Sequence, residues 1–104
     1  MALSINTSVQ DGDVLVDVEG EVDVSNAAEL RSALQEACEN AVYGIDIDFS
    51  KVSYIDSTGI GVLVGFSHRA TAARLAFGIS NVQSGVLRVL RLLGVEDELH
   101  ARAD

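Results

Sequence analysis

The segment Asp56-Ser57-Thr58 has the residue types needed to accept a phosphoryl group. It lies directly before an apolar run that suits a helix, where free N–H groups and the helix dipole favour an added negative group. A hydroxyl at that point is exposed and rigidly placed, so Ser57 is a candidate phosphorylation site, with Thr58 as second choice. The plainer alternative is that Ser57 only caps the helix, which is the commoner role of serine at such positions.

Polar residues also follow the other strands that the sequence predicts. Asp23 and Ser25 come after the second predicted strand, and Asn81 comes after the last one. In a parallel sheet, functional sites form beyond the carboxyl ends of the strands. We therefore expect one edge of the sheet to collect the side chains of Asp23, Ser25, Asp56, Ser57, Thr58 and Asn81.

Four acidic residues, Asp17, Glu19, Asp46 and Asp48, alternate with apolar residues and should share the open face of the sheet. Paired carboxylates can hold a divalent cation or carry out acid–base chemistry. A small enzyme that uses Asp46 and Asp48 is therefore one interpretation. No neighbouring His, phosphate-binding loop or nucleophile–base pair accompanies these acids, so a solvated face without metal or cofactor is the expectation.

Four other reactive or aromatic residues are expected to be structural. His68 and His100 lack a second ligand at metal-binding spacing. Cys38 lies on an apolar helix stripe and suits the core, and as the only cysteine it cannot form an internal disulfide. Tyr54 is expected to pack beside the loop that carries the candidate phosphorylation site.

The composition limits the class of protein. The chain has 104 residues, a formal net charge of -9 and a pI of about 4.4. This length predicts one domain over 1–104. The acidic balance argues against nucleic acid and membranes as partners, because a basic surface is needed for both. The longest apolar run, 59–66, is far short of the ~20 residues of a membrane helix, and without a recognisable signal peptide we expect a cytoplasmic protein.

The elements that must position these residues begin with strands. Residues 3–19 alternate with the period of two that marks half-buried strands, so they predict a hairpin with Asp11-Gly12 in its turn. Apolar residues then recur at helical spacing over 27–41. Asp23 or Ser25 is the expected N-cap of this helix.

The second half of the chain continues the mixed pattern. A strand is predicted at 43–49 with Tyr43 on its apolar face, and another at 75–80. The stretch 57–70 is ambiguous because of its three glycines, but two parallel strands need a crossover of about a dozen residues. We therefore expect a helix there, whose glycines let it lie close to the sheet.

The last predicted helix covers 82–93, with Val89 and Leu93 among its inward residues and Gly94 as its end. The segment 96–103 leaves room for only a short further helix. The element order is then ββαβαβα, an α/β fold with a mixed, mostly parallel four-stranded sheet. Because the strands alternate instead of being apolar throughout, the helices should cover one face only.

Three stretches resemble one known family. Residues 52–65, which read VSYIDSTGIGVLVG, closely resemble the signature of bacterial anti-sigma-factor antagonists of the STAS domain. Residues 20–27, which read GEVDVSNA, resemble the junction between hairpin and helix in that family, and 81–95 are similar to its last helix. The resemblance spans almost the whole chain in the same element order. It implies a single STAS domain, and the element order above agrees with that fold.

The resemblance also implies a partner-switching protein that is not an enzyme. In that family the antagonist binds an anti-sigma factor, which is also an ATP-dependent serine kinase, and so releases the sigma factor. The kinase phosphorylates the serine after the Asp of the motif, and a PP2C-type phosphatase reverses the modification. In this sequence the acceptor would be Ser57, with Asp56 and Asp23 beside it and Gly59 at the helix start. The alternative is a STAS subunit of another assembly, either a stressosome-type scaffold or a transporter-associated protein.

The charges are distributed unevenly along the chain. Residues 1–50 hold eleven acids and one base, a sum of -10, whereas residues 51–104 hold five acids and six bases, a sum of +1. One interpretation is that Arg69, and with it Arg88, borders a docking surface for an acidic partner. The other is a scatter of solvated charges without a binding role.

Overall fold

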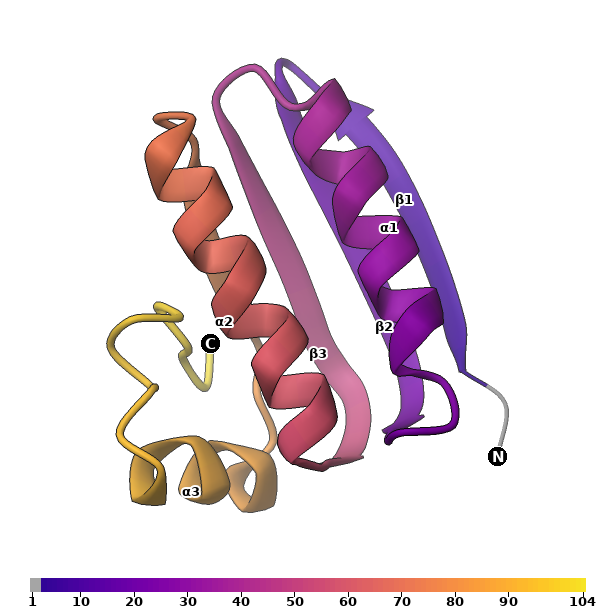
Figure 1. The fold of residues 1–104 in the computed structure, drawn as a ribbon, viewed down its shortest axis with the longest axis vertical. Coiled ribbons are helices and arrows are strands. Elements are labelled where there is room, and N and C mark those ends of the chain that lie inside the picture. Colours follow the sequence, from indigo (N-terminus) through magenta and orange to yellow (C-terminus); the bar gives the residue numbers. More distant parts are fainter. Residues whose placement is uncertain (1–2) are drawn as a thin grey trace.

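The computed structural model describes residues 3–104 and confirms the predicted mixed α/β fold (Figure 1). Its elements, in the order ββαβαβα, are β1 (Ser4–Gln10), β2 (Asp13–Val22), α1 (Ala27–Asn40), β3 (Gly44–Ile55), α2 (Ser57–Ala72), β4 (Ala76–Ser80) and α3 (Ser84–Leu92). The strands are ordered β1-β2-β3-β4, with β1 antiparallel to β2 and the other neighbours parallel. The carboxyl ends of β2, β3 and β4 therefore point in the same direction.

Helices α1 and α2 lie side by side on one face of the sheet, as the alternation predicts (Figure 1). Successive side chains of a strand point to opposite faces, so every second residue enters the layer under these helices. Val16, Ile47 and Ile79 are fully buried there and share one core with Leu34 and Leu63 of the helices. The third helix, α3, lies across the end of the sheet at which α2 begins (Figure 1).

The hairpin forms where the sequence predicts it. Asp11 and Gly12 have φ angles of 54° and 88°. Both lie in the left-handed region, which a two-residue type I′ turn requires. The pairing of β1 with β2 is continuous from Ser4, opposite Glu19, to the turn.

β3 is longer than the predicted 43–49 and reaches Ile55. The alternation of its first half stops at Phe49, and the next buried residue is Val52. The pairing with β2 shifts register twice along this second half, and each β-bulge inserts a residue that interrupts the period of two. Tyr43 was wrongly placed on the apolar face, because it precedes the strand and is 67% exposed.

α1 begins at Ala27, so the prediction of Asp23 or Ser25 as its N-cap was wrong. The N-cap position belongs to Asn26. Its side chain accepts a hydrogen bond from the Asp23 N–H at 2.9 Å and donates one to the Glu21 carbonyl at 2.8 Å. The Asp23 carboxylate is occupied within the loop by Ser25, which explains why it does not cap the helix.

α3 is shorter than the predicted 82–93 and ends before Gly94, whose φ of 72° confirms it as the helix end. Val89 and Leu93, which were expected to be inward, are 37% and 56% exposed. The helix crosses the end of the sheet instead of lying on its face. Only a narrow stripe of its surface is therefore buried.

The segment 96–103, which left room for only a short helix, turns back and pairs with β4. Ala101 forms a parallel bridge with Ile79. The N–H of Arg102 donates to the Ile79 carbonyl at 3.0 Å, and Leu99 is fully buried. This segment therefore covers the edge of β4 that faces away from β3.

Gly59 allows α2 to approach the sheet closely. A Cβ at this position would lie 2.6 Å from Cγ1 of Val22 and 2.9 Å from Cγ1 of Ile55. At Gly61 and Gly65, which are exposed, a Cβ would have no atom within 4 Å. The expectation that the glycines let the helix lie close to the sheet is thus confirmed for Gly59 and wrong for the other two.

We expect Gly59→Ala to lower the free energy of unfolding by about 1–3 kcal/mol, because the added methyl group overpacks the contact with β2 and β3. Gly61→Ala is the matched control in the same helix, and it should raise stability by about 0.5–1 kcal/mol, since alanine favours a helix and meets no atom here. Urea denaturation of both variants measures the difference. Equal effects of the two substitutions would show that the close approach at Gly59 has no energetic weight.

Candidate functional site

Asp56 lies between β3 and α2, and its carboxylate connects the start of that helix with the loop after β2. Oδ1 accepts a hydrogen bond from the Gly59 N–H at 3.1 Å, and Oδ2 accepts one from the Val24 N–H at 3.0 Å. The Asp56 N–H donates to the Val22 carbonyl at 3.0 Å. Hydrogen bonds that end on a carboxylate are stronger than neutral ones. One side chain therefore holds the start of α2 and the loop after β2 together.

Ser57 is the first residue of α2 and Thr58 the second, and both are exposed. The alternative that Ser57 caps the helix was wrong, because Asp56 is the N-cap and accepts from the Gly59 N–H. Among the contacts within residues 3–104, neither hydroxyl has a hydrogen-bond partner. Since a neighbour supplies the cap, the Ser57 hydroxyl is exposed and is not needed to start the helix.

The loop after β2 carries a second fixed carboxylate. Oδ1 of Asp23 accepts hydrogen bonds from the hydroxyl and, at 2.9 Å, from the backbone N–H of Ser25. The bonds from Ser25 lower the pKa of Asp23. This carboxylate is therefore ionised at neutral pH, and its orientation is set by its neighbour.

The structure brings together five of the six residues expected at this edge, namely Asp23, Ser25, Asp56, Ser57 and Thr58. Asn81 lies elsewhere, since its amide donates to Oδ2 of Asp48 at 3.3 Å. β4 ends at Ser80, which is opposite Asp48. β3 continues from there to Ile55, about 20 Å further along the strand. The expected convergence was wrong for Asn81 because β4 is much shorter than its neighbour.

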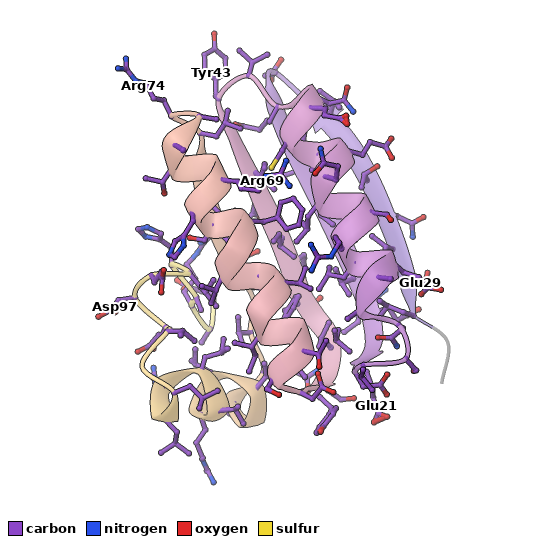
Figure 2. All side chains as sticks on the ribbon, in the orientation of Figure 1. Glu21, Glu29, Tyr43, Arg69, Arg74 and Asp97 are labelled. Atoms are coloured by element: carbon purple, nitrogen blue, oxygen red, sulfur yellow. The ribbon has the colours of Figure 1, made fainter. Side chains whose placement is uncertain are left out.

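Arg69 belongs to the layer between the helices and not to this edge. It lies about 18 Å along α2 from Ser57. Nη1 donates to Oε1 of Gln35 at 2.6 Å, and the guanidinium carbon lies 4.8 Å from the ring centre of Phe66. Figure 2 shows the Arg69 side chain between α1 and α2. Arg88 is exposed on α3.

Two exposed residues near the edge were missed from the sequence. Val24, whose N–H is bound by Asp56, is 75% exposed. Tyr54 was expected to pack but is 50% exposed. Both side chains are therefore accessible from solvent at this end of the sheet. The alternation offered no signal for Tyr54, because its outward direction follows from the bulges in β3.

The acids expected on the open face of the sheet do share it. Asp17, Glu19 and Asp48 line one shallow hollow of about 240 Å³, in which Lys51 comes within 3.9 Å of Glu19. In the part of the chain that the structure describes, no three His, Cys, Asp or Glu side chains are arranged to hold a metal ion. The hollow therefore offers paired charges but no metal centre among residues 3–104.

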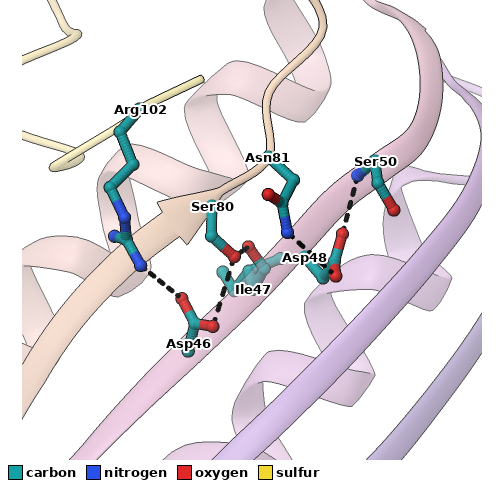
Figure 3. A network of polar contacts seen from close by, with 7 residues as sticks. All are labelled: Asp46, Ile47, Asp48, Ser50, Ser80, Asn81 and Arg102. Carbon is teal, nitrogen blue, oxygen red and sulfur yellow. Dashed lines mark hydrogen bonds and ion pairs between the residues drawn. The ribbon is translucent and has the colours of Figure 1, made fainter. Parts of the chain in front are cut away.

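Asp46 and Asp48 connect β3 with the strand and segment beside it (Figure 3). The Ser80 hydroxyl donates to Oδ2 of Asp46 at 3.2 Å, and Nη2 of Arg102 lies 3.6 Å from its Oδ1. Asp48 accepts from Asn81, as described above. These contacts explain both acids as structural residues, so they give the interpretation as a carboxylate enzyme no support.

The other residues considered from the sequence have structural surroundings. Cys38 is half-buried against the core, and burial raises the pKa of its thiol. The ring of His68 contacts the Glu98 carboxylate. Over residues 3–104, no helix combines the length and apolar character needed to cross a membrane.

Comparison with known proteins assigns the family. Residues 4–104 match the STAS domain. The chain belongs to the STAS domain family. A relative of this STAS domain, the anti-sigma-B factor antagonist of Staphylococcus aureus (strain NCTC 8325 / PS 47), is 32% identical over 100 residues, which cover 96% of this chain and 93% of that protein.

Solved structures show the same fold. An anti-sigma factor antagonist from Mycobacterium paratuberculosis superposes with a TM-score of 0.82 at 23% identity, over 99% of this STAS domain and 87% of that chain. The Bacillus cell fate determinant SpoIIAA in the phosphorylated form superposes with a TM-score of 0.72 at 22% identity, over 97% and 91% of the two chains.

We expect Asp56→Ala to lower the free energy of unfolding by about 1–2 kcal/mol, the usual effect of removing an N-cap. The Val24 N–H should also exchange faster with solvent, because Asp56 is its acceptor. Ser57→Ala is the control next to it and should change stability by less than about 0.5 kcal/mol. Denaturation and amide hydrogen exchange report the two effects. A Val24 amide that exchanges at an unchanged rate in Asp56→Ala would contradict the bridge.

Asp48 should make the domain sensitive to acid. Burial opposes its ionisation, but hydrogen bonds from Ser50 and Asn81 outweigh it, so the pKa of Asp48 lies below its usual value. Its stabilisation is present above the unfolded pKa of about 4 and is lost as the pH falls through the lower folded pKa.

We therefore expect Asp48→Asn to be less stable than wild type at pH 7 and to lose less stability on acidification below about pH 4. Asp97→Asn, an exposed position outside this network, is the control with the same change of charge. Urea midpoints across the acid range measure both variants. Parallel pH curves for Asp48→Asn and wild type would refute the assignment.

Proposed function

We propose that this STAS domain is an anti-sigma factor antagonist whose binding surface is the edge around Ser57. The unphosphorylated domain binds an anti-sigma factor that is also a serine kinase, and so releases the sigma factor. Phosphorylation of Ser57 blocks binding, and a PP2C-type phosphatase restores it. The domain acts in the cytoplasm as a binding module and performs no catalysis itself. The observation that carries the proposal is an exposed hydroxyl without a structural role at the first residue of α2.

The position of Ser57 suits reversible modification. The N–H groups in the first turn of a helix lack partners within the helix, and the dipole there favours negative charge. A phosphate on Ser57 is therefore compatible with the folded domain. The N-cap remains in place, because Asp56 provides it. Modification thus changes the surface while the fold persists.

The neighbouring carboxylates make the same phosphate unfavourable for a partner. Asp56 is held by two backbone N–H groups and Asp23 by Ser25. Neither can turn away without losing hydrogen bonds. Phosphorylation adds about -1.5 to -2 charges beside them. A partner that docks on Val24 and Tyr54 would have to bring its own groups against this concentrated negative charge.

The magnitudes are sufficient for a switch. One repulsive contact between unit charges at ~4 Å costs ~4 kcal/mol at an effective dielectric constant near 20. A thousandfold loss of affinity corresponds to ~4.1 kcal/mol. Steric and electrostatic exclusion therefore accounts for release of the partner. The mechanism requires no refolding of the domain.

The test uses four baits on a native lysate: wild type, Ser57→Ala, Ser57→Asp and Ser84→Asp. Ser84 is also the exposed first residue of a helix, α3, so it controls for a negative charge at a helix start. We expect wild type, Ser57→Ala and Ser84→Asp to retain an ATP-binding serine kinase. Ser57→Asp should bind it about 100–1000-fold more weakly when affinities are measured with the purified partner.

The kinase recovered in this way identifies the acceptor. With ATP it should phosphorylate wild type and Thr58→Ala but not Ser57→Ala, as determined by mass spectrometry. Phosphate on Thr58 of the wild type, and none on Ser57, would show that Thr58 is the acceptor. Recovery of one and the same partner by all four baits would contradict the switch and favour a scaffold or transporter-associated role.

A further inference from the structure

β1 forms an edge of the sheet and is free of the features that usually protect an edge. It pairs only with β2 among the strands of residues 3–104, and Figure 1 shows it at the outer side of the sheet. Its sequence SINTSVQ contains no charged residue and no proline, and its register has no bulge. Natural proteins commonly protect edges by these devices. An unprotected edge is available for pairing with another strand.

The turn determines which backbone groups of β1 are available. The residues that flank a two-residue turn form a hydrogen-bonded pair, here Gln10 with Asp13, and bonded and non-bonded pairs alternate from there. Ile5, Thr7 and Val9 fall in non-bonded pairs. Their N–H and C=O groups therefore point away from β2, toward solvent.

A groove runs beside these groups on the helix side of β1. It has a volume of about 350 Å³. Its apolar floor comes from Leu3 and Ile5, both half-buried, and Glu29 and Glu36 of α1 line its other side. Figure 2 shows Glu29 on the outer side of α1, above the edge strand. The lining contains two carboxylates and no Lys or Arg.

The charge of the groove selects the occupant. A second copy of the chain that paired through β1 would bring its own Glu29 and Glu36 and its net charge of -9 to the same interface, and like charges oppose such association. A strand with Lys or Arg at alternate positions would place these side chains on one face. Their aliphatic stems would cover Leu3 and Ile5, and their charged ends would reach the carboxylates.

From the edge and the groove together we infer that β1 is a second protein-binding site. It takes an extended basic segment of a partner protein, which adds to the sheet as a strand beside β1. Main-chain hydrogen bonds to Ile5, Thr7 and Val9 give affinity, and the groove gives specificity for basic and apolar side chains. This site is separate from Ser57, which lies at an end of the sheet and not along this edge.

The probe is a synthetic peptide, TKTVTKTVT, in which Lys and Val share one face of the extended chain. The control is TETVTETVT, in which Glu replaces both Lys residues and reverses the charge. In free protein we expect the amides of Ile5, Thr7 and Val9 to exchange rapidly with solvent. The Lys peptide should slow the exchange of these three amides, and the Glu peptide should not.

Variants separate the backbone from the charge contribution. Thr7→Pro removes an N–H that points to solvent, and an edge strand tolerates proline at such a position. This substitution should weaken binding of the Lys peptide at least about tenfold. Thr7→Val keeps the N–H and is its control. Glu29→Lys combined with Glu36→Lys should weaken binding by a similar factor, whereas Asp97→Lys, on an exposed turn outside the groove, should not. This double substitution also tests the site if Thr7→Pro fails to fold.

Ser57→Asp should bind the Lys peptide as tightly as wild type does, so the result is independent of the function proposed for that serine. Unchanged exchange of Ile5, Thr7 and Val9 at millimolar Lys peptide would overturn the inference. Equal binding of the Lys and Glu peptides would overturn it as well. Without any peptide, slower exchange of these amides at higher protein concentration would also overturn the inference. The strand that pairs with β1 would then belong to a second copy of the chain.

Discussion

The bridge made by the Asp56 carboxylate is the interaction on which the geometry of the edge around Ser57 depends. Its two oxygens accept hydrogen bonds from the Val24 N–H at 3.0 Å and the Gly59 N–H at 3.1 Å, so it connects the loop after β2 with the start of α2. Loops at the end of a sheet have few apolar contacts to fix them. Together with the hydrogen bond from the Asp56 N–H to the Val22 carbonyl, the bridge sets the position of Val24 relative to Ser57.

In the proposed switch, the residue that would be modified is separate from the residues that keep the fold. Asp56 caps the helix, Gly59 permits its close approach, and the hydroxyl of Ser57 contributes to neither function. A reversible modification must be tolerated by the folded state and must still change an interaction. A serine at the second of two adjacent polar positions meets both conditions, since its neighbour supplies the structural hydrogen bond.

The sequence predicts the sheet well where one face of a strand is buried throughout. Val14, Val16 and Val18 alternate without interruption, and the hairpin follows from them. Prediction fails where register shifts, because the bulges of β3 are visible only in its pairing with β2. It also fails for Asn81, since the length of β4 depends on the partner strands and not on its own residues. The caps were assigned wrongly for a related reason: several polar residues lie near each helix start, and local hydrogen bonds decide among them.

The unequal strand lengths have a consequence for function. Because β4 stops opposite Asp48, the ends of β2 and β3 form the edge around Asp56 without a contribution from β4. The polar residues at the end of β4 instead stabilise the open face, through the contacts of Ser80 and Asn81 with the acids of β3. The proposed binding at the edge around Ser57 would therefore not compete with the hydrogen bonds that hold β4 in the sheet. The long edge of β1 lies on the far side of the sheet from β4, so a strand added there would leave both regions undisturbed. With both proposed sites, such a domain would respond to a modification at one surface while it remains bound through another.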